Sequence, residues 1–397
     1  MEYGVNISER VHWIGVNDRR KHLFENIWPI PNGVSYNSYL ITDEKSALVD
    51  TLECGSDTTY LARIESLLGN RELDYLIINH MEPDHSGEIE VIVRRFPEVK
   101  IVGNRRTFEI LESYYGSRCT NFHEVKEGDV LDLGHHKLQF FLTPWVHWPE
   151  TMVTYDATER ILFSGDAFGT FGTLDGGVLD TQTRMRFYEG EMRRYYSNIV
   201  GKYSSMVQKA LEKLKSLTIN TICSVHGPVW RENVNHVVGL YDRWSRYEAD
   251  PGVTLIYASM YGNTARMADY IANGMAREGV REIRVHDISK THISYLIDAI
   301  WGYDTVVLGS CAYNTQMFPP MEQLCRELTH MGVKNKTLGI FGSYSWNGGG
   351  VRNLQKFAEE IGWPLLGMAE IHGRPELSKY ADCDALAKAV AAHLLKK

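Results

Sequence analysis

The sequence predicts an α/β protein with two parts, a sheet sandwich followed by a doubly wound parallel sheet of five strands. Three observations lead to this prediction. The chain has 397 residues, which is too long for one ordinary domain. Its first part reads as short strands followed by helices, whereas strands and helices alternate regularly in its last part. Between the two parts stands the pair Pro251-Gly252, a strong signal for a turn.

The predicted boundary between the domains lies after residue 250. The polar stretch Glu248-Ala249-Asp250 ends in the Pro-Gly pair, and the apolar segment 253–258 then begins a new strand. We therefore expect one domain at 1–250 and a second at 251–397.

Strands of the first domain are indicated by short apolar runs between turn residues. These runs are 38–41, 46–50, 74–78, 138–142 and 161–163. After the third run, Ile89, Ile92, Val93 and Phe96 recur at the spacing of an amphipathic helix, and Pro97 ends that helix.

The second domain alternates strand and helix. Strand 253–258 is followed by a helix that Gly279 closes, with apolar residues on one face: Met267, Ala268, Ile271, Ala272 and Met275. Further strands are expected at 282–285, 305–308 and 337–341. This alternation is typical of a five-stranded doubly wound parallel sheet, where ligands bind at the carboxyl ends of the strands.

Composition excludes several classes of function. The net charge of −8 does not favour binding to nucleic acid, which usually needs a basic face. No apolar run approaches the ~20 residues that span a bilayer, so no membrane segment is expected. The six cysteines are scattered and none forms a CxxC pair. This spacing argues against a disulfide framework, a zinc ribbon or a fused rubredoxin, and we expect a reducing cytoplasm.

Seven side chains of the first domain are typical metal ligands that follow apolar segments: His80, Glu82, Asp84, His85, His147, Asp166 and His226. A lone histidine is more often an ordinary loop residue, but four candidate ligands within the six residues 80–85 favour metal binding. If each ligand follows a strand, all seven lie on one rim of the sandwich. Seven ligands are too many for one tetrahedral metal and suit two metals that share a carboxylate. Four imidazoles and three carboxylates favour a non-haem di-iron or di-manganese pair.

Three loops of the second domain are expected to bind a flavin. The turn after the first strand contains Ser259, Met260, Tyr261, Gly262, Asn263 and Thr264. Its hydroxyls, amide and backbone N–H groups at a helix N-terminus can hold a phosphate monoester without a lysine. The loops after the third and fourth strands add Ala312, Tyr313, Asn314, Thr315, Ser343, Tyr344, Trp346, Asn347 and Gly348. The turn resembles that of flavodoxins, and we expect bound FMN on which Tyr and Trp side chains stack.

The metal cluster carries a further resemblance. Its pattern His-x-Glu-x-Asp-His, with the later His, Asp and His, resembles the metallo-β-lactamase fold, an αββα sandwich. Zinc hydrolases of that superfamily usually have His-x-His-x-Asp-His. Glu82 replaces the second histidine here, and this harder oxygen donor suits iron better than zinc. With its flavodoxin-like second domain, essentially the whole chain resembles the flavodiiron proteins (A-type flavoproteins).

The resemblance implies a ligand set and an activity. One iron is bound by His80, Glu82 and His147, the other by Asp84, His85 and His226, and Asp166 bridges the two. The implied enzyme is a reductase that uses FMN and the di-iron centre to reduce O2 to water by four electrons, or nitric oxide to nitrous oxide, and we favour O2. A head-to-tail homodimer, or a dimer of such dimers, is expected. Because the chain has no CxxC module, a separate electron donor such as rubredoxin is expected.

Substrate preference is not decided by these motifs. Tyr195 or Tyr196 is expected to place a hydroxyl near the irons. Many family members have a histidine near position 25, but this chain reads His22-Leu23-Phe24-Glu25, so that residue is absent or displaced. Two other functions would share parts of this pattern. A zinc hydrolase of the same fold would need neither Glu82 nor a flavin domain, and a simple electron carrier would not keep all seven metal ligands.

Overall fold

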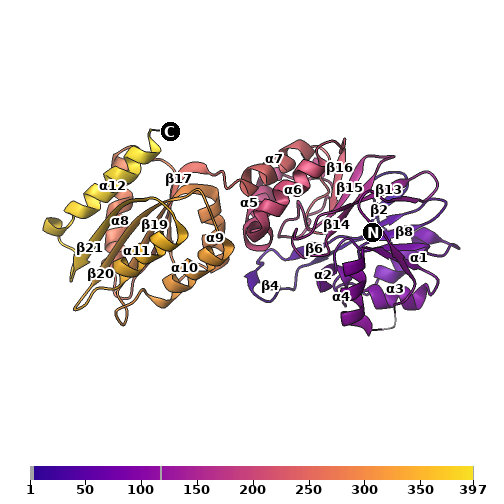
Figure 1. Ribbon diagram of the computed structural model, residues 1–397, viewed down its shortest axis with the longest axis horizontal. Coiled ribbons are helices and arrows are strands. Elements are labelled where there is room, and N and C mark those ends of the chain that lie inside the picture. The colour runs from indigo at the N-terminus through magenta and orange to yellow at the C-terminus, as the bar shows by residue number, and fades with distance from the viewer. Residues whose placement is uncertain (1–3, 117–118, 397) are drawn as a thin grey trace. The chain divides into compact units, whose positions relative to one another are not determined.

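Within residues 4–116 and 119–396, which the computed structural model describes, three large sheets organise the protein (Figure 1). The chain divides into two compact units between Asp242 and Arg243. This division falls inside α7 (Val234–Ser245), upstream of the boundary after residue 250, which stays a prediction.

Two sheets build the first unit. One has seven strands in the order β1-β2-β7-β8-β9-β10-β11, and the other has five in the order β12-β13-β14-β15-β16. The first sheet contains β1 (Val5–Asn6), β2 (Val11–Trp13), β7 (Tyr39–Ile41), β8 (Ala47–Val49), β9 (Tyr75–Ile77), β10 (Lys100–Gly103) and β11 (Phe122–Glu124). The second contains β12 (Val130–Asp132), β13 (Lys137–Leu142), β14 (Met152–Asp156), β15 (Ile161–Gly165) and β16 (Thr221–Ser224). Two short hairpins, β3 (Val16–Asp18) with β6 (Val34–Tyr36) and β4 (Leu23–Phe24) with β5 (Trp28–Pro29), complete the strands.

The two sheets pack face to face, with helices outside. The rings of Tyr39 on β7 and Phe163 on β15 meet at 5.5 Å, and every residue of β7, β8 and β9 is buried. Strands that are buried throughout have both faces covered. The helices are α1 (Tyr60–Leu68), α2 (Pro83–Ser86), α3 (Ile89–Arg95), α4 (Arg105–Tyr115), α5 (Met185–Tyr195), α6 (Ser204–Leu214) and α7. Figure 1 shows α1, α3 and α4 beside the seven-stranded sheet and α6 and α7 beside the five-stranded one. The predicted αββα sandwich is confirmed.

The second unit is built on one parallel sheet with the order β18-β17-β19-β20-β21. Its strands are β17 (Asp250–Ala258), β18 (Ile283–Asp287), β19 (Tyr303–Cys311), β20 (Thr337–Tyr344) and β21 (Leu365–His372). Its helices are α8 (Asn263–Arg277), α9 (Ile293–Gly302), α10 (Pro319–Met331), α11 (Gly350–Ile361) and α12 (Ala381–Leu394). Helices α8 and α12 contact each other, and α10 contacts α11. The predicted doubly wound sheet of five parallel strands is confirmed.

The core of the second unit explains why α8 could be predicted from the spacing of its apolar residues. Met267, Ile271 and Met275 are each 0% exposed, and they pack with Leu255 of β17 and Val390 of α12. Residues spaced by three or four positions on α8 therefore form one apolar stripe against the sheet.

A glycine on β19 makes room for an aromatic ring in this sheet. A Cβ added at Gly309 would lie 2.1 Å from Cζ of Phe341, whose side chain is fully buried. We expect Gly309→Ala to lower the free energy of unfolding by about 1–3 kcal/mol through overpacking, as measured by urea denaturation. Gly239→Ala is the control, because no atom lies within 4 Å of its new Cβ on α7. The steric explanation is wrong if both variants unfold at the same urea concentration.

Candidate metal centre and flavin pocket

The predicted metal ligands all come from segments that follow strands of the two facing sheets. His80 follows β9, and the next three ligands lie in and just before α2. His147 stands in the connection between β13 and β14, Asp166 follows β15, and His226 follows β16. Asp84 and His85 lie in the short helix α2. Glu82 is its extended N-cap residue and Pro83 begins the helical turn, so the chain changes direction within the ligand cluster.

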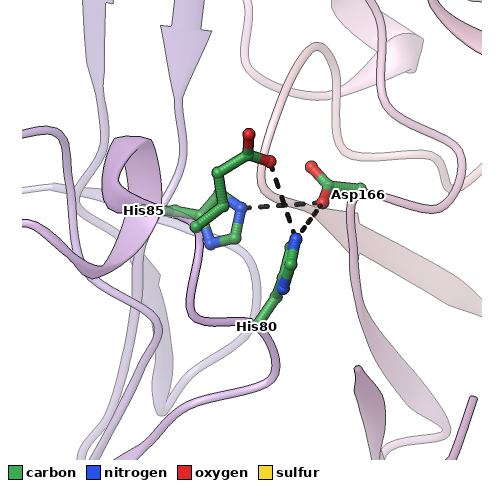
Figure 2. Close-up of side chains that lie close together, drawn as sticks. His80, His85 and Asp166 are labelled. Atoms are coloured by element: carbon green, nitrogen blue, oxygen red, sulfur yellow. Dashed lines mark ion pairs between the residues drawn. The ribbon is translucent and has the colours of Figure 1, made fainter. Parts of the chain in front are cut away.

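The structure brings all seven side chains together. Figure 2 shows His80, His85 and Asp166 pointing toward one another. Nε2 of His80 lies 3.4 Å from Oδ2 of Asp166, and Nε2 of His85 lies 3.6 Å from the same oxygen. Around a metal with bonds of about 2.1 Å, neighbouring ligand atoms are roughly 3–3.5 Å apart. These spacings therefore fit ligands that share an ion.

Asp166 stands between two sets of ligands. Its Oδ2 atom lies 3.4 Å from Nε2 of His147, and its Oδ1 atom lies 3.4 Å from Nε2 of His226. On the Oδ2 side, Nε2 of His147 is 3.0 Å from Oε2 of Glu82. On the Oδ1 side, Nε2 of His226 is 3.2 Å from Oδ2 of Asp84. One carboxylate thus faces two groups of donors, the arrangement of a bridging ligand.

Buried atoms without hydrogen-bond partners provide a test of whether metals fit. Nε2 of His80, His85 and His226, both oxygens of Asp84 and Oδ2 of Asp166 are buried and have no hydrogen-bond partner. Leaving so many polar atoms unsatisfied in one small volume is costly, and buried polar groups are normally paired. Two cations placed among them satisfy these atoms together. The residues therefore fit a di-metal centre.

The electrostatics of the cluster also favour cations. Burial alone would lower the pKa of His80, but the hydrogen bond with Glu150 and the nearby carboxylates of Glu82 and Asp166 outweigh burial and raise it to about 10. Burial likewise opposes the charge of Asp166, but His85 and the other histidines hold the pKa of this carboxyl well below its usual range. The carboxylates are therefore charged and stabilise positive charge in their midst.

Two ligand histidines are oriented by the nitrogen that faces away from the centre. Nδ1 of His80 bonds to Oε1 of Glu150 at 2.6 Å, and Nδ1 of His226 bonds to the carbonyl oxygen of Ser35 at 2.8 Å. Each bond places the proton on Nδ1 and leaves the Nε2 lone pair free for a metal. The sequence interpretation missed Glu150, because a single carboxylate in a loop forms no local pattern.

Two further side chains reach the centre. The hydroxyl of Tyr195 donates to Oδ1 of Asp166 at 2.7 Å, whereas the hydroxyl of Tyr196 lies 2.9 Å from Oγ of Ser204. Of the two tyrosines, Tyr195 is therefore the one beside the cluster.

A carboxylate oxygen of Glu25 lies within 4.8 Å of ligand atoms of Glu82 and His147. Burial and the charge of Glu82 raise the pKa of Glu25 to about 7. Glu25 thus presents a carboxyl group beside the ligand cluster.

The flavin loops of the second unit enclose a pocket of about 240 Å³. Of the predicted residues, Ser259, Met260, Tyr261, Asn263, Thr264, Ala312, Tyr313, Asn314, Thr315, Ser343, Tyr344, Trp346 and Asn347 line it. Gly262 and Gly348 do not, and Cys311 and Ser345 line it in addition. The three loops predicted from separate parts of the sequence therefore form one site.

The pocket has the shape and chemistry of a site for a planar ligand with a phosphate. Gly262, at φ 93°, turns the chain into the 15-residue helix α8, and its N–H donates to Oγ of Ser259 at 3.1 Å. The first N–H groups of such a helix favour an anion. The rim holds Tyr261 and Trp346, which are 92% and 83% exposed. Large aromatic side chains exposed around a pocket are well placed to stack on a flat ring.

Comparisons with known proteins agree with both sites. A model of the ODP family beta lactamase matches residues 34–227, and a Flavodoxin model matches residues 255–385. An anaerobic nitric oxide reductase flavorubredoxin of Shigella dysenteriae is 30% identical over 375 residues, which are 93% of this chain and 78% of that protein. Rubredoxin oxygen:oxidoreductase of Desulfovibrio gigas has a TM-score of 0.94, with 27% identity and 99% of each chain covered. The flavodiiron protein of Giardia intestinalis has a TM-score of 0.90 with 25% identity, covering 99% of this chain and 98% of its own.

These matches extend over both units, and the chain belongs to the flavodiiron proteins. The protein is an oxidoreductase, with FMN and a non-haem di-iron centre as its cofactors. Among the described residues, no helix is both long and apolar enough to cross a membrane.

The contact of Glu150 with His80 can be tested by metal affinity. We expect Glu150→Gln to weaken iron binding by about 10–100-fold, because the amide holds the His80 imidazole less firmly in the tautomer that binds metal. Competition with a chelator measures the affinity, and circular dichroism checks that the variant is folded. The control is Glu109→Gln, since Glu109 is exposed on α4. Equal iron affinity in both variants would show that Glu150 does not position the ligand.

The aromatic rim can be tested by flavin binding. We expect Trp346→Ala to raise the dissociation constant for FMN roughly tenfold, since stacking on a flat base contributes about 1–3 kcal/mol. Titration of the apoprotein, followed by quenching of flavin fluorescence, measures this constant. Leu377→Ala is a matched control, because Leu377 is 89% exposed and does not line the pocket. An unchanged constant in Trp346→Ala removes Trp346 from the site.

Proposed function

We propose that this protein reduces O2 to water by four electrons, with His80, Glu82 and His147 as ligands of one iron and Asp84, His85 and His226 as ligands of the other. Asp166 is the shared ligand. The observation that carries the proposal is the buried seven-residue cluster, in which one carboxylate faces two groups of donors. When bound, the irons deliver electrons to a small substrate and FMN supplies them one at a time.

The donor set supports iron rather than zinc. Glu82 contributes an oxygen on the side of His80 and His147, and its Oε2 atom is 3.6 Å from Nε2 of His80. Oxygen and imidazole donors without any thiolate are typical of non-haem iron. The three carboxylates also cancel most of the charge of two divalent ions, while the imidazoles are neutral. This cancellation lowers the free-energy cost of burying the centre without a bound counterion.

Residues around the ligands keep this centre ready for chemistry. The Tyr195 hydroxyl holds Asp166 by donating to Oδ1, and Glu150 holds His80. Burial of Tyr195, together with the charge of Asp166, raises the pKa of the phenol well above its usual range, so this group keeps its proton at neutral pH. Orientation of both ligands before the substrate arrives lowers the cost of reorganisation during the reaction.

Reduction of nitric oxide to nitrous oxide is the second candidate. The Shigella dysenteriae relative is named a nitric oxide reductase, whereas the Desulfovibrio gigas protein is named an oxygen oxidoreductase. The same metal site can bind either diatomic molecule. We favour O2 because the structure of the oxygen oxidoreductase superposes on 99% of this chain with a TM-score of 0.94.

Electron supply and assembly belong to the same proposal. A rubredoxin-type protein is the donor that we propose, in line with the name of the Desulfovibrio gigas enzyme. A head-to-tail homodimer, or a dimer of such dimers, and a cytoplasmic location remain predictions.

The proposal is tested by following O2 and NO with electrodes after anaerobic reduction of the iron-loaded, FMN-loaded protein. We expect O2 to be consumed faster than NO and without release of peroxide. His147→Ala should lower the iron content and reduce both rates at least about tenfold, since it removes a direct ligand. His330→Ala, a change of an exposed histidine on α10, should leave both unchanged.

Three results would contradict this assignment. Faster loss of NO makes the protein a nitric oxide reductase. Loss of neither gas, with zinc bound in place of iron, points to a hydrolase. Unchanged iron content in His147→Ala removes His147 from the ligand set.

A further inference from the structure

Two turns of the five-stranded sheet meet at a second cluster of metal-type side chains. His135 and His136 lie in the turn between β12 and β13, and Glu159 lies in the turn between β14 and β15. One ligand atom from each of these residues lies within 4.8 Å of the other two. Neither the proposed function nor the family matches use this cluster.

The backbone of the two turns is fixed by hydrogen bonds between them. The N–H of Ala157 donates to the carbonyl oxygen of Lys137 at 3.0 Å. Oγ1 of Thr158 donates to the carbonyl oxygen of His135 at 3.0 Å and accepts from the N–H of Lys137 at 3.3 Å. The side chains therefore start from neighbouring, constrained backbone positions, which reduces the entropy lost when they converge on a ligand.

His136 has the features of a metal ligand that is already oriented. Its side chain is 0% exposed, and its Nδ1 atom bonds to Oδ2 of Asp156 at 2.8 Å. Asp156 is also 0% exposed. A carboxylate on Nδ1 places the proton there and leaves the Nε2 lone pair available, the arrangement seen behind many zinc-bound histidines. Nε2 of His136 is buried and has no hydrogen-bond partner.

Glu159 lies on the side of this free nitrogen, and the ring of His135 lies beside that of His136. Oε1 of Glu159 is 3.9 Å from Nε2 of His136, too far for a hydrogen bond but close to the spacing of two ligands around one ion. The Glu159 side chain is 25% exposed, and the rings of His135 and His136 are 5.1 Å apart at 85°. The more open donors thus surround a buried one, and water can complete the coordination from the solvent side.

We infer that His135, His136 and Glu159 bind one divalent zinc ion, with a water molecule as the fourth ligand and Asp156 behind His136. Two imidazoles and one carboxylate, with a fourth position left for water, form the ligand set of known tetrahedral zinc sites. The ion clamps the β12–β13 turn to the β14–β15 turn and stabilises the first unit.

This site is separate from the di-iron centre. Glu159 precedes β15 and Asp166 follows it, so the two clusters lie at opposite ends of the strand. A strand of five residues is roughly 15 Å long. A zinc ion in the turns therefore does not compete with iron for ligands, and its presence can be measured in protein that already holds iron.

A proton on Nε2 of His136 is the alternative to a metal ion at this atom. Burial lowers the pKa of His136, but the bond with Asp156 and the nearby acidic groups outweigh it and raise the pKa. A protonated His136 between Asp156 and Glu159 would form an ion pair. That ion pair leaves Nε2 at 3.9 Å from its acceptor, and it gives His135 no part in the cluster.

The experiment uses the full chain without a histidine tag, loaded with iron and FMN and dialysed against ZnCl2. We expect one zinc ion per chain in addition to unchanged iron, measured by elemental analysis, and a higher melting temperature. His135→Ala and Glu159→Gln should each weaken zinc binding by at least about tenfold and remove the rise in melting temperature. Both changes are at the surface of the turn, so the buried His136–Asp156 pair keeps its place.

His330→Ala provides the control, since it removes an exposed histidine from the other unit and should bind zinc like the unchanged protein. Equal zinc binding in His135→Ala and in the unchanged protein would overturn the inference. So would zinc that enters only as iron leaves, because that ion occupies the di-iron centre. Substitution by Co²⁺ adds a spectroscopic test: an absorption spectrum without the bands of tetrahedral cobalt would also contradict the assigned geometry. None of these outcomes depends on whether the enzyme reduces O2 or NO.

Discussion

The Asp166 carboxylate is the interaction on which the metal centre depends. It is a fully buried negative charge, and its two oxygens face different sets of ligands. A charge in this position is unfavourable unless cations or donors surround it on all sides. His147 and His226 approach from opposite oxygens, and Tyr195 donates a hydrogen bond to Oδ1. Because these partners come from three different connections, the arrangement depends on how the sheets hold their strand ends.

Hydrogen bonds within the sandwich hold one of these strand ends. The main chain of β16 accepts hydrogen bonds from the side chain of Tyr39 on β7 of the facing sheet and from that of Asn37, which precedes this strand. The carbonyl oxygen of Ser35 on β6 fixes the ring of His226. The segment 35–39 therefore both contacts β16 and orients a metal ligand that follows this strand.

Local signals explain which parts were predictable from the sequence. The cluster 80–85 and the turn 259–264 are continuous in sequence, so their chemistry could be read directly. The helix α8 and its strand were readable because Met267, Ile271 and Met275 repeat with the helical period. Glu150 and Glu25 were not identified, because a single carboxylate in a loop has no local pattern. Their places are set by the hairpin β4–β5 and by the connection after β13, which only the fold brings to the metal ligands.

The two cofactor sites differ in how far their side chains are buried. The metal centre concentrates charge, so its ligands are buried, and several of their polar atoms have no hydrogen-bond partner within the protein. The flavin pocket must admit a large planar molecule, so its aromatic side chains Tyr261 and Trp346 remain exposed at the rim. Buried ligand atoms that converge on one position indicate a small cation. Exposed aromatic side chains around a helix N-terminus indicate a flat anionic ligand. By the first criterion, Nε2 of His136 belongs with the ligands of the di-iron centre rather than with ordinary core histidines such as His12, both of whose ring nitrogens are hydrogen-bonded.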